Sequence, residues 1–357
     1  MKSRLQTNLI WLTRLTVSAS LFTACGPAAS DRLNAGSANS GSNARTTLYV
    51  ASGGCYGGGV ALTAGSGTIA AFDSTTGALR RVVLDYTTYS PGDVPVSISD
   101  YDSTRLLVTV ENASGRRLDL VNKDGSGSAT FLTNSTALSG VLRAAQLLTD
   151  GSVLVSKSTM IEKFAASKSR ITQGANAYIQ SPASTCATTA TLIDAIATTS
   201  NGKILYAHSA VTPNNKVVMI AQSGYSLTTD CLATQAAPTT LAMPTALLVH
   251  SSGDLLVAYG STTIASNTVH SYKLNITTNA ITAATQSYYD GSIVNGPSAI
   301  TENPTDSNIF VANALSTMNT IERFSYNPTT QTMTRVEGRI GPNLYTKCVS
   351  AMKAIAE

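Results

Sequence analysis

LYVA at Leu48–Ala51 is the first of six similar tetrapeptides that recur about every fifty residues along the chain. The other five are LLVT (Leu106–Thr109), VLVS (Val153–Ser156), ILYA (Ile204–Ala207), LLVA (Leu255–Ala258) and IFVA (Ile309–Ala312). Where the unit is complete, an apolar stretch and a Gly, Asp, Asn or Ser turn precede the tetrapeptide. A fixed period of this length indicates units that bury their apolar faces against their neighbours. The repeat therefore predicts architecture and says little about chemistry.

Each repeat unit divides into four predicted strands. The last unit gives strands at Ser298–Thr301, Asn308–Ala312, Thr320–Ser325 and Met333–Glu337. The fifth unit gives strands at Thr245–His250, Leu255–Tyr259, Thr268–Leu274 and Ile281–Ser287. Short β-rich runs separated by Asp-Gly and Asn-Gly turns are typical of antiparallel hairpins. Six such units predict an all-β fold, a six-bladed β-propeller with four-stranded antiparallel blades.

The pattern over residues 46–357 resembles six-bladed propellers of the NHL and gluconolactonase type. The first unit lacks its first strand, and a strand-like segment, Val349–Ile355, stands alone at the other end. We expect the N- and C-terminal segments to share the closing blade, because this pairing leaves no open edge in the ring.

The first 24 residues read as an export signal, with a basic start and a short apolar stretch, Leu15–Ala24. The sequence Leu21-Phe22-Thr23-Ala24-Cys25 resembles a bacterial lipobox, although the family prefers Leu where Phe22 stands. The resemblance implies cleavage before Cys25 and acylation (palmitate) of that residue; the alternative is a soluble secreted protein with a free Cys25. Gly26 resembles the sorting pattern of outer-membrane lipoproteins. Residues 25–45 are then a lipidated cysteine with a flexible tether.

Charge argues against a nucleic-acid partner. Only 12% of the residues are charged. The signal segment holds three of the 24 basic residues, which leaves 21 against 20 acidic residues. A nucleic-acid partner needs a basic stripe, and the sequence has no run of like charges longer than two.

Four cysteines remain after Cys25, an even number that favours disulfides in an exported protein. Cys55 follows the second strand of the closing blade and Cys348 precedes its first strand. These two are therefore expected to form a disulfide that joins the two ends of the ring. Cys186 and Cys231 flank the fourth blade on the same face and form the other predicted pair. The rival reading is metal binding, but no C-x-x-C is present and the spacings fit no zinc motif.

The long connections are predicted to lie on one face of the ring, because turns within hairpins alternate between the two faces. They are Ser52–Gly67, Thr87–Val94, Thr133–Gly140, Gln180–Ala190, Ala233–Met243, Gly260–Asn267 and Asp290–Gly296. Long loops on a rigid scaffold are the usual carriers of recognition. We therefore expect the function on this rim, with Tyr56 among its contact residues. Ser52–Gly67 is glycine-rich and reads as a flexible insert.

One constellation resembles the channel calcium site of gluconolactonase-like propellers. Asn295-Gly296 precedes the first strand of the sixth blade, and Asn313 follows its second strand, where that family often has Asp. The corresponding positions of the other blades hold Ser52, Val110, Lys157, His208 and Tyr259. A hard divalent cation needs several oxygen ligands, usually including carboxylates. Few acidic residues are close by in sequence, so no metal or other cofactor is predicted, and Ca²⁺ belongs only to the alternative reading below.

Other catalytic signals are weak. Of the three histidines, His208 is expected on the loop rim, His250 on the opposite face and His270 towards the outside. No nucleophile elbow or zinc-protease motif is present. The sequence therefore favours a lipid-anchored, non-enzymatic binding or scaffolding propeller of the cell envelope that meets a protein or glycan partner. The alternative is a metal-dependent, lactonase-like hydrolase with a cation in the central channel.

Overall fold

The structure is a computed structural model of the 357-residue chain. It describes residues 45–57, 60–89, 92–112, 115–133, 138, 140–172, 178–180, 192–209, 215–220, 231–239, 242–260, 268–283, 285–288, 290–314 and 319–357, and the side chains of residues 55–65, 89, 179, 180 and 209 are not included. The predicted signal segment, Cys25 and the tether as far as residue 44 lie outside these residues.

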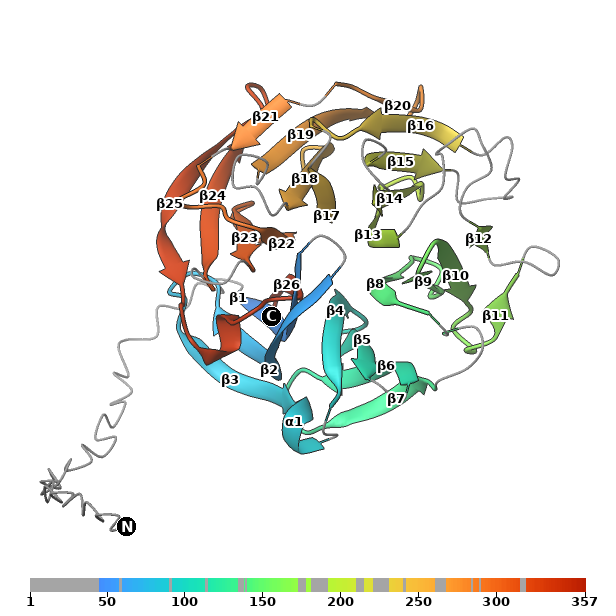
Figure 1. The fold of residues 1–357 in the computed structure, drawn as a ribbon, viewed down its shortest axis with the longest axis vertical. Coiled ribbons are helices and arrows are strands. Elements are labelled where there is room, and N and C mark those ends of the chain that lie inside the picture. The colour runs from blue at the N-terminus through green and yellow to red at the C-terminus, as the bar shows by residue number, and fades with distance from the viewer. Residues whose placement is uncertain are drawn as a thin grey trace, which may run out of the picture. The chain divides into compact units, whose positions relative to one another are not determined.

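Residues 45–357 form six antiparallel sheets arranged around one axis, as Figure 1 shows. Blade 1 contains β26 (Ala351–Ala356), β1 (Thr46–Gly57), β2 (Val60–Asp73) and β3 (Leu79–Asp85). Blade 2 contains β4 (Val94–Asp100), β5 (Arg105–Asn112), β6 (Gly115–Asn122) and β7 (Ser128–Leu132). Blade 3 contains β8 (Leu142–Leu147), β9 (Val153–Lys157), β10 (Met160–Phe164), β11 (Arg170–Ile171) and β12 (Ile179–Gln180).

The second half of the ring repeats this arrangement. Blade 4 contains β13 (Leu192–Thr198), β14 (Ile204–Ser209), β15 (Lys216–Ile220) and β16 (Cys231–Ala236). Blade 5 contains β17 (Met243–Val249), β18 (Asp254–Gly260), β19 (Thr268–Asn275), β20 (Ala280–Ile281) and β21 (Thr285–Tyr288). Blade 6 contains β22 (Pro297–Glu302), β23 (Ile309–Asn313), β24 (Ile321–Asn327) and β25 (Thr332–Ile340). The described helices are one turn each, α1 (Tyr86–Tyr89) and η3 (Leu344–Thr346). The predicted six-bladed, all-β fold is confirmed.

The innermost strand of blade 1 comes from the far end of the chain. β26 pairs antiparallel with β1, from Thr46 opposite Ala356 to Ala51 opposite Ala351. The side chain of Glu357 accepts a hydrogen bond from Thr47 Oγ1 at 2.6 Å and another from the Tyr49 hydroxyl. Backbone and side-chain bonds together therefore join the two ends of the propeller within one sheet.

The core explains why the repeated tetrapeptides are apolar throughout. Leu48 and Val50 pack in the cluster between blades 6 and 1, whereas Tyr49 and Ala51 pack in the cluster between blades 1 and 2. Successive side chains of a strand point to opposite faces, and both faces of a propeller blade are covered by a neighbour. One such cluster lies between each pair of adjacent blades.

Three predicted segments differ from the structure. Ser52–Gly67, predicted to be a flexible insert, mostly continues β1 and β2 as a hairpin that pairs as far as Gly57 and Val60, and Figure 1 shows it drawn across the middle of the ring. The predicted connection Ala233–Met243 begins inside β16. The single strand expected at Ile281–Ser287 is divided into β20 and β21, which both pair with β19.

Candidate functional site

The six innermost strands, β4, β8, β13, β17, β22 and β26, surround a central channel with a cavity of about 300 Å³. Each of these strands pairs on one side only, so its other edge faces the channel. Cavities of about this size hold small-molecule ligands, at the lower end of the usual range. The channel is therefore one of two candidate sites, and the rim of long connections is the other.

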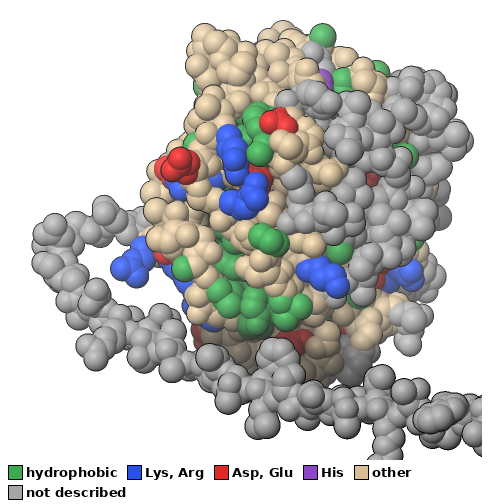
Figure 2. All heavy atoms as spheres, turned by 60° about the vertical axis from the view of Figure 1, so that its left-hand side comes forward, with side chains coloured by type: hydrophobic (Ala, Val, Ile, Leu, Met, Phe, Trp, Pro, Cys, Tyr) green, Lys and Arg blue, Asp and Glu red, His purple; other side chains and the backbone are tan. Residues whose placement is uncertain are grey.

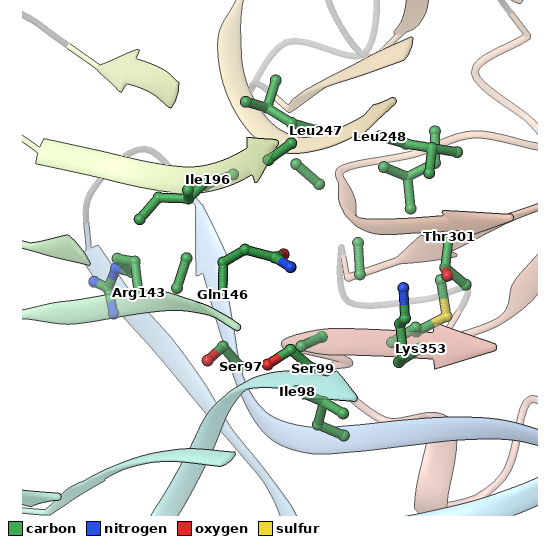
Figure 3. A pocket seen from close by; sticks show the side chains of 18 of the residues that line it. Ser97, Ile98, Ser99, Arg143, Gln146, Ile196, Leu247, Leu248, Thr301 and Lys353 are labelled. Carbon is green, nitrogen blue, oxygen red and sulfur yellow. The ribbon is translucent and has the colours of Figure 1, made fainter. Parts of the chain in front are cut away.

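The walls of the channel combine apolar and polar side chains (Figure 3). Ile196, Leu247 and Leu248, from blades 4 and 5, form an apolar side. Gln146 and Lys353 point into the cavity from blades 3 and 1, whereas the labelled Arg143 side chain points away from its centre. Apolar residues line the other blades as well, among them Ile98 beside Ser99, so a ligand in this channel would meet hydrocarbon and polar groups together.

Two of the polar groups are incompletely satisfied. Gln146 donates from its amide NH₂ to the carbonyl of Leu147 at 2.9 Å, and its side-chain oxygen accepts no hydrogen bond from the described residues. The buried hydroxyl of Ser99 has no hydrogen-bond partner among the described residues. Buried polar groups are normally hydrogen-bonded, so an unsatisfied hydroxyl in a cavity wall calls for a partner.

Lys353 brings a cationic group into the channel. Burial lowers the pKa of its ammonium, while the charges of Asp100 and Glu302 act in the opposite direction. Both carboxylates are already engaged, because Asp100 pairs with Lys123 at 2.9 Å and Glu302 accepts from the backbone N–H of Ser251 at 2.8 Å. Lys353 therefore has distant rather than direct charge partners.

At the face that carries the long connections, hydrogen bonds join every blade to the next. Two of the donors, Thr245 and Ser298, stand at β-bulges of the innermost strands, where a residue is left out of the pairing. The six bonds are Ser350 Oγ to Pro95 O (2.6 Å), Leu142 N to Glu111 Oε1 (2.7 Å), Ile193 N to Ser158 O (2.8 Å), Asn215 Nδ2 to Ala242 O (3.0 Å), Thr245 Oγ1 to Pro297 O (2.6 Å) and Ser298 Oγ to Val349 O (2.6 Å). We call this set the interblade ring.

The residues predicted for binding at the ends of the second strands are buried. Ser52, His208 and Tyr259 have no exposed surface. Ser52 donates to the carbonyl of Lys347 and accepts from the backbone N–H of Ser66. The hydroxyl of Tyr259 shares a hydrogen bond with that of Tyr272. In the described structure these side chains support the blades; the side chain of Tyr56 lies outside it.

The predicted pair Asn295 and Asn313 does come together. Asn313 accepts from the backbone N–H of Asn295 at 3.0 Å and donates to the carbonyl of Ile293 at 2.7 Å and to Thr320 at 3.2 Å. The side chain of Asn313 therefore shapes the entry to blade 6. Within the described part of the chain, no three His, Cys, Asp or Glu side chains form a group that could hold a metal ion.

Lys157, the remaining predicted residue, belongs to a buried ion network that the sequence reading missed. Its ammonium lies 3.4 Å from Glu162, and the same carboxylate receives two bonds of 2.8 Å from Arg170. Glu322 is equally buried in blade 6, bound by Arg335 at 2.8 Å and Arg339 at 2.7 Å. Both glutamates occupy the second position of the same four-residue pattern, IEKF at 161–164 and IERF at 321–324, and this repeat could have pointed to them in the sequence.

The third histidine also differs from expectation. His270, expected to face outwards, is only 7% exposed and lies edge-on against the Tyr259 ring, with centroids 5.6 Å apart. Burial lowers its pKa to about 4. His250 packs near Glu302, with 3.5 Å between Nε2 and Oε1, at the turn that follows β17.

The cysteines are resolved in part. Cys231 and Cys348 are each disulfide-bonded, and the side chains of Cys55 and Cys186 lie outside the described set. The pairings Cys55–Cys348 and Cys186–Cys231 therefore stay predictions. Cys348 is buried next to Ala314, and its backbone N–H donates to Asn319 Oδ1 at 3.2 Å.

Much of the predicted rim falls outside the described residues, including most of the 133–140, 180–190 and 260–267 connections. On the side formed by blades 6 and 1, Figure 2 shows charged side chains in small separate groups among uncharged atoms. The described residues contain no helix that is both long and apolar enough to span a membrane.

Solved structures share this fold. One chain of a nidogen/laminin complex is 12% identical over 87% of this chain and 98% of its own, with a TM-score of 0.59. A protein from Lactobacillus plantarum is 8% identical over 87% of this chain and 99% of its own, with a TM-score of 0.55. A gluconolactonase from Xanthomonas campestris is 10% identical over 68% of this chain and 78% of its own, with a TM-score of 0.47. At these identities the first two likenesses show the fold alone, and the third is too weak to support an argument.

No family model matches the chain, and no curated relative matches it. The class defined by the coordinates is thus a six-bladed β-propeller.

Proposed function

We propose that this chain is a lipid-anchored propeller of the bacterial cell envelope that binds a partner through its long-connection face without catalysing a reaction. The interblade ring is the observation that carries the proposal. It closes all six blade junctions at the base of the long connections. A scaffold fixed in this way presents its loops in a constant arrangement, which lowers the cost of ordering them on binding.

The predicted site residues support a structural rather than a catalytic part for this face. The polar side-chain atoms of Ser52, Tyr259 and Asn313 form hydrogen bonds within the propeller. A general base or nucleophile must reach a substrate, and these buried side chains do not. We propose an envelope protein as the partner, and a glycan is the alternative.

A photo-crosslinking amino acid tests the face. It is placed at Thr239 or Ser292, exposed positions in connections on the long-connection face, and at Thr277 or Thr329, exposed positions in turns on the opposite face. In cells that express the full chain, we expect a discrete crosslinked protein from the first pair only. Equal crosslinking from both faces, or none from the first pair, would show that this face is not the binding surface.

The anchor is tested separately with Cys25→Ser. We expect this variant to lose lipidation and to leave the membrane fraction, with an unchanged melting temperature, because residues 26–44 separate Cys25 from the propeller. A Cys25→Ser protein that stays in the membrane fraction would remove the lipoprotein part of the proposal.

A further inference from the structure

The central channel combines an ammonium, a buried hydroxyl without a partner and an apolar wall. Ser99 is 6% exposed, and its Oγ has no hydrogen-bond partner among the described residues. Lys353 makes no ion pair and no side-chain hydrogen bond within the same residues, and Figure 3 shows its side chain directed into the cavity. None of these groups takes part in the interblade ring or in the proposed partner contact.

The position of Lys353 is not explained by the fold. The two acidic groups whose charges act on Lys353, Asp100 and Glu302, have partners of their own in Lys123, His250 and the backbone of Ser251. Ala351 and Ile355, its neighbours on the same face of β26, pack on the apolar cluster between blades 1 and 2. An apolar residue would continue this row, and placing an ammonium in a partly buried position without a direct partner is unfavourable. A ligand anion would supply the missing charge.

We propose that the channel binds a small carboxylate with an apolar body. Its carboxylate would accept hydrogen bonds from Lys353 and Ser99, which are both donors, and its hydrocarbon part would lie against Ile196, Leu247 and Leu248. The cavity of about 300 Å³ limits the ligand to a small molecule. This site is independent of the long-connection face, so either proposal can fail without the other.

Isothermal titration calorimetry on the mature full-length protein tests the site with four probes. Hexanoate has both the carboxylate and the apolar body, acetate has only the carboxylate, hexanol has only the body, and hexylamine has the body with the opposite charge. We expect hexanoate to bind with one site per chain and about tenfold or more tighter than the other three. No binding of hexanoate, or equal binding of hexylamine, would overturn the proposal.

Two variants assign the residues. Lys353→Met keeps an unbranched apolar stem without the charge, and Ser99→Ala removes the hydroxyl; we expect about a tenfold loss of hexanoate affinity in the first and a smaller loss in the second. Lys347→Met, an exposed lysine in the segment before β26, is the matched control and should bind like the parent.

A urea titration of the same variants separates binding from folding. If Lys353 serves the ligand, Lys353→Met should unfold at the same or a higher urea concentration than the parent, because a partly buried charge without a direct partner has been removed. A lower urea midpoint of Lys353→Met would show that the lysine stabilises the fold, and unchanged hexanoate affinity would show that it does not hold the ligand; either result would refute the assignment.

Discussion

The buried His270 predicts a specific loss of stability in mild acid. The residue is 7% exposed, its Nδ1 has no hydrogen-bond partner among the described residues, and burial lowers its pKa from 6.5 to about 4. Between these two values the unfolded chain binds a proton at this residue and the folded chain does not. The free energy of unfolding therefore falls as the pH falls from about 6.5 towards 4.

The size of the effect follows from the two pKa values. At pH 7 the imidazole is almost neutral in both states, and at pH 5 it is mostly protonated only in the unfolded chain. The linkage relation gives a loss of about 2 kcal/mol from this residue over those two pH units. His270→Phe keeps an aromatic ring against Tyr259 and removes the titrating group, so it should remove this part of the pH dependence.

Urea unfolding of the parent and of His270→Phe at pH 7 and pH 5 measures the effect. The carboxylates and the other two histidines are common to both proteins, so their titration cancels in the difference between parent and variant. We expect that difference to change by about 2 kcal/mol in favour of the variant when the pH is lowered. If both proteins lose the same free energy of unfolding, the histidine is not buried in its neutral form and the reasoning fails.

Three further predictions concern the ion network, the disulfide at Cys348 and the alternative function. Glu322→Gln should lower the free energy of unfolding by about 2 kcal/mol or more, because it leaves Arg335 and Arg339 without their shared carboxylate. The control Glu337→Gln, at an exposed position of β25 between these two arginines, should change it little, and equal urea midpoints for the two variants would contradict the prediction. Cys348→Ser should lower the melting temperature in oxidising buffer and expose β26 to proteolysis, because a disulfide contributes about 2–4 kcal/mol. A melting temperature equal to that of the parent would count against a disulfide where the two ends of the propeller meet. EDTA and added calcium should leave the melting temperature of the protein unchanged; a calcium-dependent rise would favour the metal-dependent hydrolase instead.

The architecture could be predicted because it depends on local and repeated signals. The alternation of Leu48, Tyr49, Val50 and Ala51 between two interfaces requires apolar residues at every position, and this requirement recurs in each blade. Turn residues then divide each unit into strands. The hairpin formed by β1 and β2 was missed because its glycines read as a flexible loop, although their backbone groups can pair like any others.

The site was harder to predict because it depends on contacts between distant residues. The sequence places Asn295 and Asn313 near each other. That Asn313 fixes the backbone leading into blade 6 follows only from its hydrogen bonds to Ile293 and Thr320. Lys353 lies in an apolar strand and has no local signal of function. Its importance becomes visible only when six strands, far apart in the sequence, enclose one cavity.

The origin of β26 at the end of the chain has a consequence for how the protein is made. β1 is synthesised more than 290 residues before the strand that covers its inner edge. Throughout that interval it presents free N–H and C=O groups beside Leu48–Ala51, a combination that invites pairing with other nascent chains. Folding should therefore depend on covering this edge until the last segment has been synthesised, and removal of β26 should make the protein aggregate.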